Sequence, residues 1–464
     1  MVEKSVEVAE KLSGCAAQIC IMPDCGCAFG LHERVYVCPK CGGPLEIDCK
    51  PPEGVLPSAL RARWDARAVS QEPQDRSGVW RYREVLPFDE AVRCVTLFEG
   101  NTPLYDAPRC AKYAGMDALR LKHQGCNPTG SFKDTGMTVA VTQALALGAR
   151  TVVCASTGNT AASLAAYAAR AGLQAAILLP RGQITASKLA QSMDYGAAVF
   201  ELDGNFDDCM RLIQELGDEP SIYVANSINP FRIEGQKTVA YELMTQLGWH
   251  VPDQIVVPGG NMGNSSALGK GFDEMLALGL IDRLPKLNII QAEGTAPLTA
   301  LFATLPAKDV TAAAKLPENA LSAVEHPRTL ATAIKIGAPV SWRKSLRAVL
   351  RSGGQIISVS EQEIADAKAM IGRDGIGCEP ASATTVAGTR RLTGSGHIHR
   401  GESVVAVLTG HVLKDPDYVS QYHRGTLALE ADGTTIKIAG TFANAPQRVA
   451  PNKAALLEQL ESRR

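Results

Sequence analysis

Lys133 lies in a segment whose residue types could carry out covalent chemistry. The segment Asn127–Asp134 (NPTGSFKD) contains a Pro-Thr-Gly step that predicts a turn, and the small apolar residues of 137–147 predict a helix after it. A lysine near the positive end of a helix, in a pocket that excludes water, has a lowered pKa, as an imine-forming lysine requires. Taken alone, the segment fits equally a surface lysine in the first turn of a helix, with Asp134 as a capping charge.

A second loop combines hydroxyl side chains with a glycine directly after the apolar run 151–155. Backbone N–H groups and hydroxyls at a helix start can bind an anion, for example a substrate carboxylate. The candidate binding residues in this loop are Ser156, Thr157, Asn159 and Thr160. An ordinary helix N-cap uses the same residue types, so the loop is open to both interpretations.

A third loop is rich in glycine and follows the apolar run 254–258. Glycines let the backbone approach a phosphate closely, and the start of the next helix favours its negative charge. The predicted phosphate site consists of Gly259, Gly260, Asn261, Met262, Gly263 and Asn264. The spacing is GGxxG rather than the GxGxxG of dinucleotide sites, but Glu293 closes the next predicted strand, so a dinucleotide site stays an alternative.

A fourth loop places Thr409 directly after the apolar run 403–408. A hydroxyl at the end of a strand can meet the far side of a bound ring, although a turn with a capping threonine is an equal local explanation. The four loops together offer an amine, an anion-binding site, a phosphate-binding site and a partner for a ring nitrogen. That combination is what pyridoxal phosphate (PLP) needs from a protein.

The elements that must position these loops can be read from the alternation of short β-branched runs with Ala-rich stretches. Such alternation predicts βαβ units, parallel sheets covered on both faces, and loops gathered along one sheet edge, where α/β proteins bind ligands. The predicted strands are Thr151–Ala155, Ala175–Leu179, Ala197–Leu202, Ile222–Ala225, Gln254–Val257, Leu287–Ala292, Gln355–Val359 and Ser403–Leu408. The predicted helices between them include Thr160–Ala171, Ala186–Tyr195 and Asn205–Leu216, and residues after Asp415 show no clear pattern.

Composition limits the class of protein. A chain of 464 residues predicts two or three domains, and its net charge of −1 gives no general attraction to nucleic acid or to an anionic membrane. The first residues lack the apolar stretch of a signal peptide, and no apolar run approaches the ~20 residues of a membrane helix. Thirteen cysteines, an odd number, favour free thiols, and we expect a cytoplasmic protein.

Six segments, in matching order, resemble the fold-type II PLP enzymes and within them the plant-like branch of the threonine synthase family. They are Glu99–Leu104 (EGNTPL), Leu121–Met137 (LKHQGCNPTGSFKDTGM), Ala155–Ser163 (ASTGNTAAS), Ala225–Thr238 (ANSINPFRIEGQKT), Val257–Asn264 (VPGGNMGN) and Leu408–Pro416 (LTGHVLKDP). The resemblance implies an α/β fold like that of the tryptophan synthase β subunit, with two open parallel-sheet domains and the cofactor between them. We expect a helical segment at 51–96, a catalytic core at 97–430 with a smaller α/β domain of about 135–230 inserted in the larger one, and a C-terminal tail at 431–464.

The resemblance also implies roles for the matching residues at the cofactor. Lys133 would form the Schiff base with PLP, and Phe132 would pack beside it. Asn159 would hydrogen-bond the phenolate oxygen, and Gly259 to Asn264 would hold the phosphate. Thr409 would face the pyridine nitrogen, where a hydroxyl would leave the ring largely unprotonated and a weaker electron sink than one paired with a carboxylate.

The activity that the resemblance implies is conversion of O-phospho-L-homoserine and water to L-threonine and phosphate, a carbon–oxygen lyase reaction. The residues matching those that bind the substrate phosphate are Thr160, Ser227, Arg232 and Asn261. A threonine or serine dehydratase would not need this second phosphate site, so Arg232, with its planar fork of donors, discriminates between them. A nucleotide-binding oxidoreductase would leave Lys133 without a task, and intact motifs argue against a silent paralogue. We expect a small-molecule substrate, no nucleic-acid or membrane partner and, from the family, a homodimer.

A cysteine-rich head occupies residues 1–50 and ends at the step Lys50-Pro51-Pro52. The spacing of Cys20, Cys25, Cys38 and Cys41 resembles a zinc ribbon, and four thiolates suit tetrahedral Zn²⁺. The alternative is a ribbon that has lost its metal, with Cys27 a spare thiol in either case. Five Lys and Arg against seven Asp and Glu give the head a net charge of −2, the wrong sign for contacts with nucleic-acid phosphates.

Overall fold

A six-stranded sheet forms the centre of the larger part of the molecule. The computed structural model describes residues 16–49, 54–89, 91–182, 186–305, 308–431 and 433–461, so residues 1–15 of the head and the Lys50-Pro51-Pro52 step lie outside the described residues. The strand order is β12-β11-β10-β13-β5-β4. Their bounds are β12 Ile356–Val359, β11 Lys286–Ala292, β10 Gln254–Pro258, β13 Val404–Leu408, β5 Arg120–His123 and β4 Leu104–Asp106.

Most of this sheet is parallel, as the alternation of strands and helices predicted. The pairs β10–β11, β10–β13, β11–β12 and β13–β5 are parallel. The edge strand β4 is the exception, since it pairs antiparallel with β5 through the register Tyr105–Leu121. Sequence periodicity did not indicate β4 or β5, because strands of three and four residues are too short to show a period.

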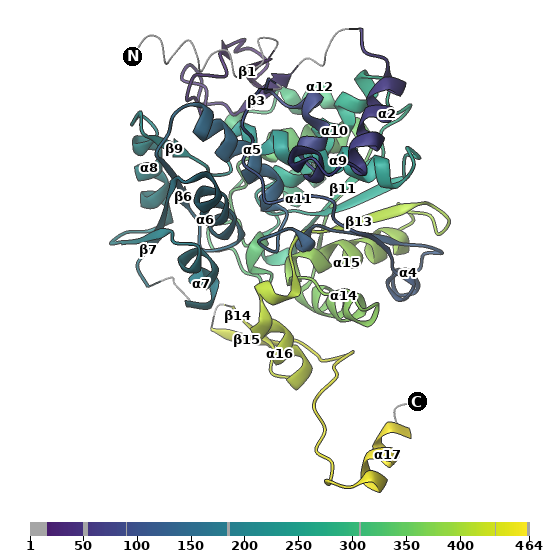
Figure 1. The fold of residues 1–464 in the computed structure, drawn as a ribbon. Coiled ribbons are helices and arrows are strands. Elements are labelled where there is room, and N and C mark those ends of the chain that lie inside the picture. The colour runs from purple at the N-terminus through teal and green to yellow at the C-terminus, as the bar shows by residue number, and fades with distance from the viewer. Residues whose placement is uncertain are drawn as a thin grey trace.

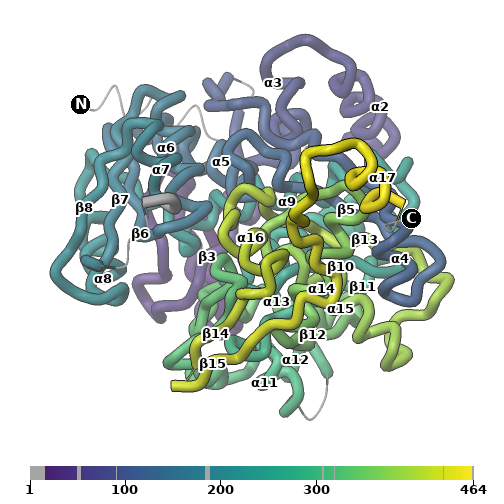
Figure 2. Tube along the Cα trace, turned by 90° about the horizontal axis from the view of Figure 1, so that it is seen from below, coloured from purple at the N-terminus to yellow at the C-terminus, as the bar shows by residue number. Residues whose placement is uncertain are grey.

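A second, four-stranded sheet is parallel throughout and has the order β8-β7-β6-β9. The strands are β6 Thr151–Ala155, β7 Gln174–Pro180, β8 Ala198–Leu202 and β9 Ile222–Val224. Every one lies within a residue or two of its predicted range. Figures 1 and 2 show this sheet, with α6 and α8, on one side of the molecule and β10–β13, with α13 to α15, on the other.

Helices cover both sheets and connect them. Those that follow the strands of the smaller sheet are α6 Asn159–Ala171, α7 Ala186–Asp194 and α8 Phe206–Leu216, and those around the larger sheet are α4 Pro108–Ala114, α10 Gly263–Ala277, α11 Pro297–Thr304, α12 Val310–Ala314, α13 Trp342–Ser352, α14 Glu361–Arg373 and α15 Pro380–Gly394. Helix α9, Pro230–Gln246, packs against both α5, Lys133–Ala146, and α10. Gly235 permits the contact with α5, since a Cβ at this position would lie 1.9 Å from the carbonyl oxygen of Thr135.

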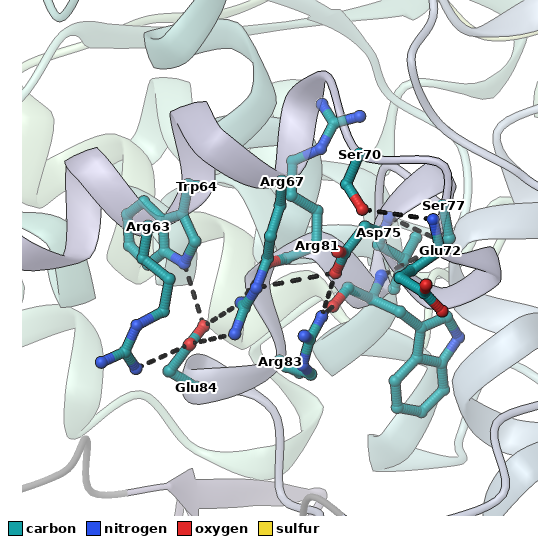
Figure 3. Close-up of polar contacts among 12 residues, drawn as sticks. Arg63, Trp64, Arg67, Ser70, Glu72, Asp75, Ser77, Arg81, Arg83 and Glu84 are labelled. Carbon is teal, nitrogen blue, oxygen red and sulfur yellow. Dashed lines mark hydrogen bonds and ion pairs between the residues drawn. The ribbon is translucent and has the colours of Figure 1, made fainter.

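The segment before the core folds as α2 Pro57–Ala68, α3 Pro73–Arg76 and the 3₁₀ turn Trp80–Val85. Its polar centre is Glu84, whose carboxylate accepts hydrogen bonds from Trp64, Arg63 and both terminal nitrogens of Arg67 (Figure 3). The carboxylate of Glu84 is therefore paired, and Trp64 lies fully buried against Tyr241 of α9. The expected helical character of this segment agrees with these elements.

The cysteine-rich head contributes a three-stranded antiparallel sheet, β2-β1-β3, with β1 Ala16–Cys20, β2 Ala28–Phe29 and β3 Leu45–Cys49. Two buried lysines of the core fasten β3. Lys270 of α10 donates to the carbonyl of Ile47, and Lys344 of α13 donates to the carbonyl of Leu45. The head is thus tied by its backbone to the helix that begins at the glycine-rich loop.

The C-terminal part contains elements that the sequence did not indicate. Helix α16 (Pro416–Arg424) is followed by the hairpin β14 (Ala428–Ala431) and β15 (Thr434–Lys437), and α17 spans Lys453–Glu461. Figure 1 shows α17 at the end of an extended segment, apart from the body. Within the described part of the chain, no helix is both long enough and apolar enough to cross a membrane.

Candidate active site

Lys133 is the first residue of α5, so the predicted position at a loop-to-helix junction is confirmed. The loop before it is held against the loop after β13. The backbone N–H of Phe132 donates to the carbonyl of Thr409 at 2.9 Å, and that of His411 donates to the carbonyl of Gly130 at 2.9 Å. Thr409 and Lys133 therefore lie at one edge of the larger sheet although 276 residues separate them in the chain.

The lysine side chain is half-buried and lies over the ring of Phe132, with Nζ 4.3 Å from the ring centroid. Loss of solvent around the ammonium and, to a smaller extent, the nearby guanidinium of Arg232 lower its pKa, and Glu379 opposes them, so that the pKa is about 7. A lysine with this pKa is partly neutral near pH 7 and can therefore act as a nucleophile.

Arg232 lies in the first turn of α9 and is 2 % exposed. Its Nη1 donates to the carbonyl of Ala225 at 3.1 Å, but its Nε has no hydrogen-bond partner among the described residues. Burial lowers the pKa of this guanidinium to about 10. A buried cation with an unmatched donor is costly, because desolvation is not offset by a paired charge, and such a guanidinium is suited to bind an anion.

Ser227 and Asn261, two of the residues predicted to bind substrate, lie in contact. The amide of Asn261 donates to the hydroxyl of Ser227, and its Oδ1 accepts from the backbone N–H of Val340 at 2.6 Å. The contact joins the loop after β9 to the loop after β10, and so links the two sheets at this edge.

The glycine-rich loop lies between β10 and the start of α10. Gly260 is close to Ile334, since a Cβ there would be 3.0 Å from its Cγ2, and Met262 adopts a left-handed conformation (φ 64°) that turns the chain into the helix at Gly263. Asn264 is buried, and neither its Nδ2 nor its Oδ1 has a partner in the described structure. A 15-residue helix with an unsatisfied amide in its first turn is suited to bind phosphate.

The Ser156–Thr160 loop forms the start of α6. The hydroxyl of Ser156 accepts from the backbone N–H of Gly158 at 3.2 Å, and Asn159 is the first residue of the helix. The side chains of Thr157 and Thr160 are half-buried beside it. Asn159 donates through Nδ2 to the carboxylate of Glu379 at 3.0 Å, which brings the smaller sheet's loop to the loop of the larger one.

Comparison with known proteins shows which family this chain belongs to. A family model described as pyridoxal-phosphate dependent enzyme matches residues 95–410. A protein of Methanocaldococcus jannaschii, described as threonine synthase, is 45 % identical over 89 % of this chain and 97 % of its own length. One of Mycobacterium bovis with the same description is 47 % identical over 72 % of this chain and 88 % of its own length.

The chain belongs to the threonine synthase family of PLP-dependent enzymes. The family resemblance that the six sequence segments indicated is thereby confirmed, and the nucleotide-binding alternative is not supported. A third member of the threonine synthase family, from Synechocystis, is 43 % identical over 79 % of this chain and 92 % of its own length.

Solved structures confirm the fold-type II architecture. A fungal L-serine ammonia-lyase from Rhizomucor miehei has a TM-score of 0.58 at 21 % identity and covers 71 % of this chain and 99 % of its own. The processed form of threonine deaminase isoform 2 from Solanum lycopersicum has a TM-score of 0.55 at 20 % identity, over 67 % of this chain and 79 % of its own. At these identities the likeness shows the α/β fold that this threonine synthase family member shares, and no more.

Glu379 is a buried residue of the site that the sequence did not single out. It precedes Pro380, which starts α15, and its carboxylate reaches both Asn159 and Thr409. A glutamate followed by a proline at a helix start was a signal that could have been noticed, since acidic residues favour the positive end of a helix. Only the fold, however, brings this helix start to the loop after β13.

The four predicted metal-binding cysteines form a cluster in the head. The Sγ atoms of Cys20, Cys25, Cys38 and Cys41 all lie within 4.8 Å of one another, with Cys20 to Cys41 and Cys25 to Cys38 at 3.5 Å. Every cysteine in the described ranges is a free thiol, as predicted. The cluster lies outside residues 95–410, the part matched by the PLP family model.

Proposed function

We propose that this member of the threonine synthase family converts O-phospho-L-homoserine and water to L-threonine and phosphate with PLP as cofactor. The observation that carries the proposal is a buried, incompletely paired guanidinium, Arg232, in the same site as a lysine whose pKa is about 7. The lysine supports PLP chemistry, and the guanidinium supports a substrate that carries its own phosphate.

The residues present fit PLP. Lys133 offers a partly neutral amine, and Asn264, with both amide atoms unpaired, offers hydrogen bonds at the start of α10. We assign the cofactor phosphate to the loop Gly259–Asn264, the phenolate oxygen of the ring to Asn159, and the ring nitrogen to Thr409. When bound, PLP supplies an aldehyde carbon that bonds to amines and a ring that withdraws electrons from the α-carbon of the substrate.

The protein's own residues bind the two charged groups of the substrate. Ser156 and Thr157, with the N–H groups at the start of α6, hold the substrate carboxylate. Arg232 and its neighbours hold the substrate phosphate; these neighbours are Thr160, Ser227 and Asn261. This clamp orients the Cγ–O bond that breaks, and the positive charge of Arg232 favours departure of the phosphate.

Lys133 is the acid and base of this proposal. Its pKa of about 7 lets Nζ release and regain a proton near neutral pH, so it can remove the α-proton of the substrate and later return a proton there. The half-buried position beside Phe132 limits access of bulk water to this proton.

The test is to incubate the purified protein with O-phospho-L-homoserine and to measure phosphate and threonine together. We expect equal release of both, from a yellow protein, and loss of both in Lys133→Ala. Yellow protein that ignores this substrate and instead makes 2-oxobutyrate from threonine would identify a dehydratase.

We also propose that the cysteine cluster holds a structural zinc ion. Tetrahedral Zn²⁺ with thiolate bonds of about 2.3 Å requires sulfur–sulfur distances of about 3.8 Å, and the four Sγ atoms already lie within 4.8 Å of one another. Elemental analysis should find one zinc per chain, and Cys38→Ser should remove it, whereas Cys49→Ser, a cysteine of the same lobe outside the cluster, should not.

We propose a homodimer on the family resemblance alone, and a cytoplasmic location on the cysteine content of the sequence. Sedimentation equilibrium of the purified protein tests the first, and cell fractionation tests the second. A monomeric mass at micromolar concentration would contradict the dimer.

A further inference from the structure

Glu379 is a buried carboxylate that connects two of the residues assigned to the cofactor. It is 4 % exposed. Its Oε2 accepts a hydrogen bond from Nδ2 of Asn159 at 3.0 Å, and its Oε1 accepts one from the hydroxyl of Thr409 at 3.1 Å. Both contacts cross between loops that are far apart in the chain, so the carboxylate is positioned by the fold rather than by its neighbours in sequence.

The hydrogen bonds of Ser382 decide which way the hydroxyl of Thr409 points. The Ser382 Oγ accepts the backbone N–H groups of Thr409 at 2.8 Å and of Gly410 at 3.1 Å, which occupies both of its lone pairs. Its own proton is then directed to the Thr409 oxygen, 3.1 Å away. Thr409 therefore accepts from Ser382 and donates its own proton to Glu379.

We propose that Glu379 is a positioning residue that acts on the cofactor ring through Thr409: its carboxylate accepts the hydrogen bond of the Thr409 hydroxyl, and the Thr409 oxygen is left to accept a hydrogen bond from a protonated ring nitrogen. This inference rests on the proposed function, because it needs the ring nitrogen at Thr409. It reverses the expectation from the sequence, where a hydroxyl partner implied a largely unprotonated ring and a weaker electron sink.

The proton count balances without any other reactant. With an ionised carboxylate, Thr409 donates to Glu379 and the ring nitrogen keeps its proton. In the alternative arrangement the ring proton moves to the Thr409 oxygen while the Thr409 proton moves to Glu379. The net result is transfer of one proton from the ring nitrogen to the carboxylate, with no proton gained or lost. The negative carboxylate thus balances the positive charge of the protonated ring, with the Thr409 hydroxyl between the two groups.

The charges that face Glu379 favour its ionised form. Burial is the largest effect and raises the carboxyl pKa, while the hydrogen bonds from Asn159 and Thr409, the charge of Lys414 and the positive end of the 15-residue helix α15 act in the opposite direction. The charge of Lys133 does so as well before this lysine bonds to PLP. The neighbouring Cys378 adds no charge near neutral pH, because burial raises the pKa of its thiol to about 12. Gly410 keeps the contact close, since a Cβ there would lie 2.3 Å from Cδ of Glu379.

The experiment is to load the full-length protein with PLP labelled with ¹⁵N in the ring and to record the ¹⁵N resonance at neutral pH. The native protein should show the frequency of a protonated pyridine nitrogen. Glu379→Gln, which keeps the size but removes the negative charge, should show that of a neutral nitrogen. Its kcat should fall by about 10²-fold with little change in KM, because the ring withdraws electrons less strongly after binding.

Glu361→Gln is the matched control. Glu361 is also a carboxylate at the start of a helix with a pKa raised by burial, and it accepts the backbone N–H of Leu330 at 3.1 Å, apart from the contacts described here. It should leave the resonance where the native protein has it. If Glu379→Gln does not fold, Thr409→Val decides, because removing the relaying hydroxyl must give a neutral nitrogen as well.

Two results overturn the inference: a neutral ring nitrogen in the native protein, or the same protonated nitrogen in the native protein and in whichever of Glu379→Gln and Thr409→Val folds. Neither result touches the proposed function, because PLP is bound in both. Native protein that takes up no PLP and makes no threonine would instead contradict the proposed function.

Discussion

Two sets of buried cations in this protein differ in how they are paired. Between α9 and α10, the ammonium of Lys237 is fully buried and bonds to the carboxylates of Glu234 at 2.6 Å and Glu274 at 2.8 Å. At the candidate site, Lys133 and Arg232 have no carboxylate salt bridge in the described structure. One set satisfies its charges within the protein, and the other leaves them to be satisfied from outside.

The pKa values follow this difference. Burial lowers the pKa of Lys237, but the two glutamates outweigh burial and raise it above its usual value. At Lys133 burial is reinforced by Arg232 and only partly opposed by Glu379, so the pKa falls to about 7. Burial lowers the pKa of both lysines, so it is pairing with carboxylates that separates Lys237 from Lys133.

Lys133→Ala, at the candidate site, should abolish activity. We expect a loss of activity on the order of 10⁴-fold or more, because the covalent link and the acid–base group disappear together. Phosphate release from O-phospho-L-homoserine measures it. The thermal unfolding temperature should stay close to that of the native protein, and a large drop would show that Lys133 supports the fold after all.

Lys237→Met should have the opposite effect, with a loss of stability and an unchanged kcat. Removing one partner of a buried ion network leaves Glu234 and Glu274 with an uncompensated charge, so we expect a loss of about 3–5 kcal/mol in the free energy of unfolding. Chemical unfolding measures this change. The folded fraction should keep its kcat, since none of the proposed substrate contacts involves Lys237. Unchanged stability would contradict the distinction between the two sets.

Arg232→Met sharpens the comparison, because activity and stability should move in opposite directions. Loss of charge-assisted hydrogen bonds to the substrate phosphate should lower kcat/KM by about 10²-fold. Removal of a buried, incompletely paired cation should leave stability unchanged or raise it by about 1 kcal/mol. Steady-state kinetics and unfolding curves measure the two effects, and a clear destabilisation would indicate that Arg232 has a structural partner.

The smallest effect concerns pH. Only the neutral amine of Lys133 attacks the aldehyde of PLP, so the rate of PLP uptake by the cofactor-free protein should rise with pH and level off above about 7. Stopped-flow absorbance measures this rate. A midpoint near 10, the value of an ordinary lysine, would mean that the site does not lower the pKa as described.

Much of the fold was predictable because the signals are local. The strand β6 has the predicted bounds, and Lys133 begins a helix as its surrounding turn and apolar residues indicated. The edge strand β4 and the elements after Asp415 were missed, because short strands and mixed polar segments carry no clear period.

The sequence by itself determined the candidate loops, since glycine, hydroxyl and lysine residues were each visible at the end of a predicted strand or the start of a helix. Only the tertiary structure decided which side chains meet. Glu379 reaches Asn159 and Thr409 because the two sheets bring three distant loops to one edge, and Arg232 is left incompletely paired because α9 buries it beside that edge. Local pattern fixes the backbone, but contacts between distant side chains, and the charges left without partners, are set by how the elements pack.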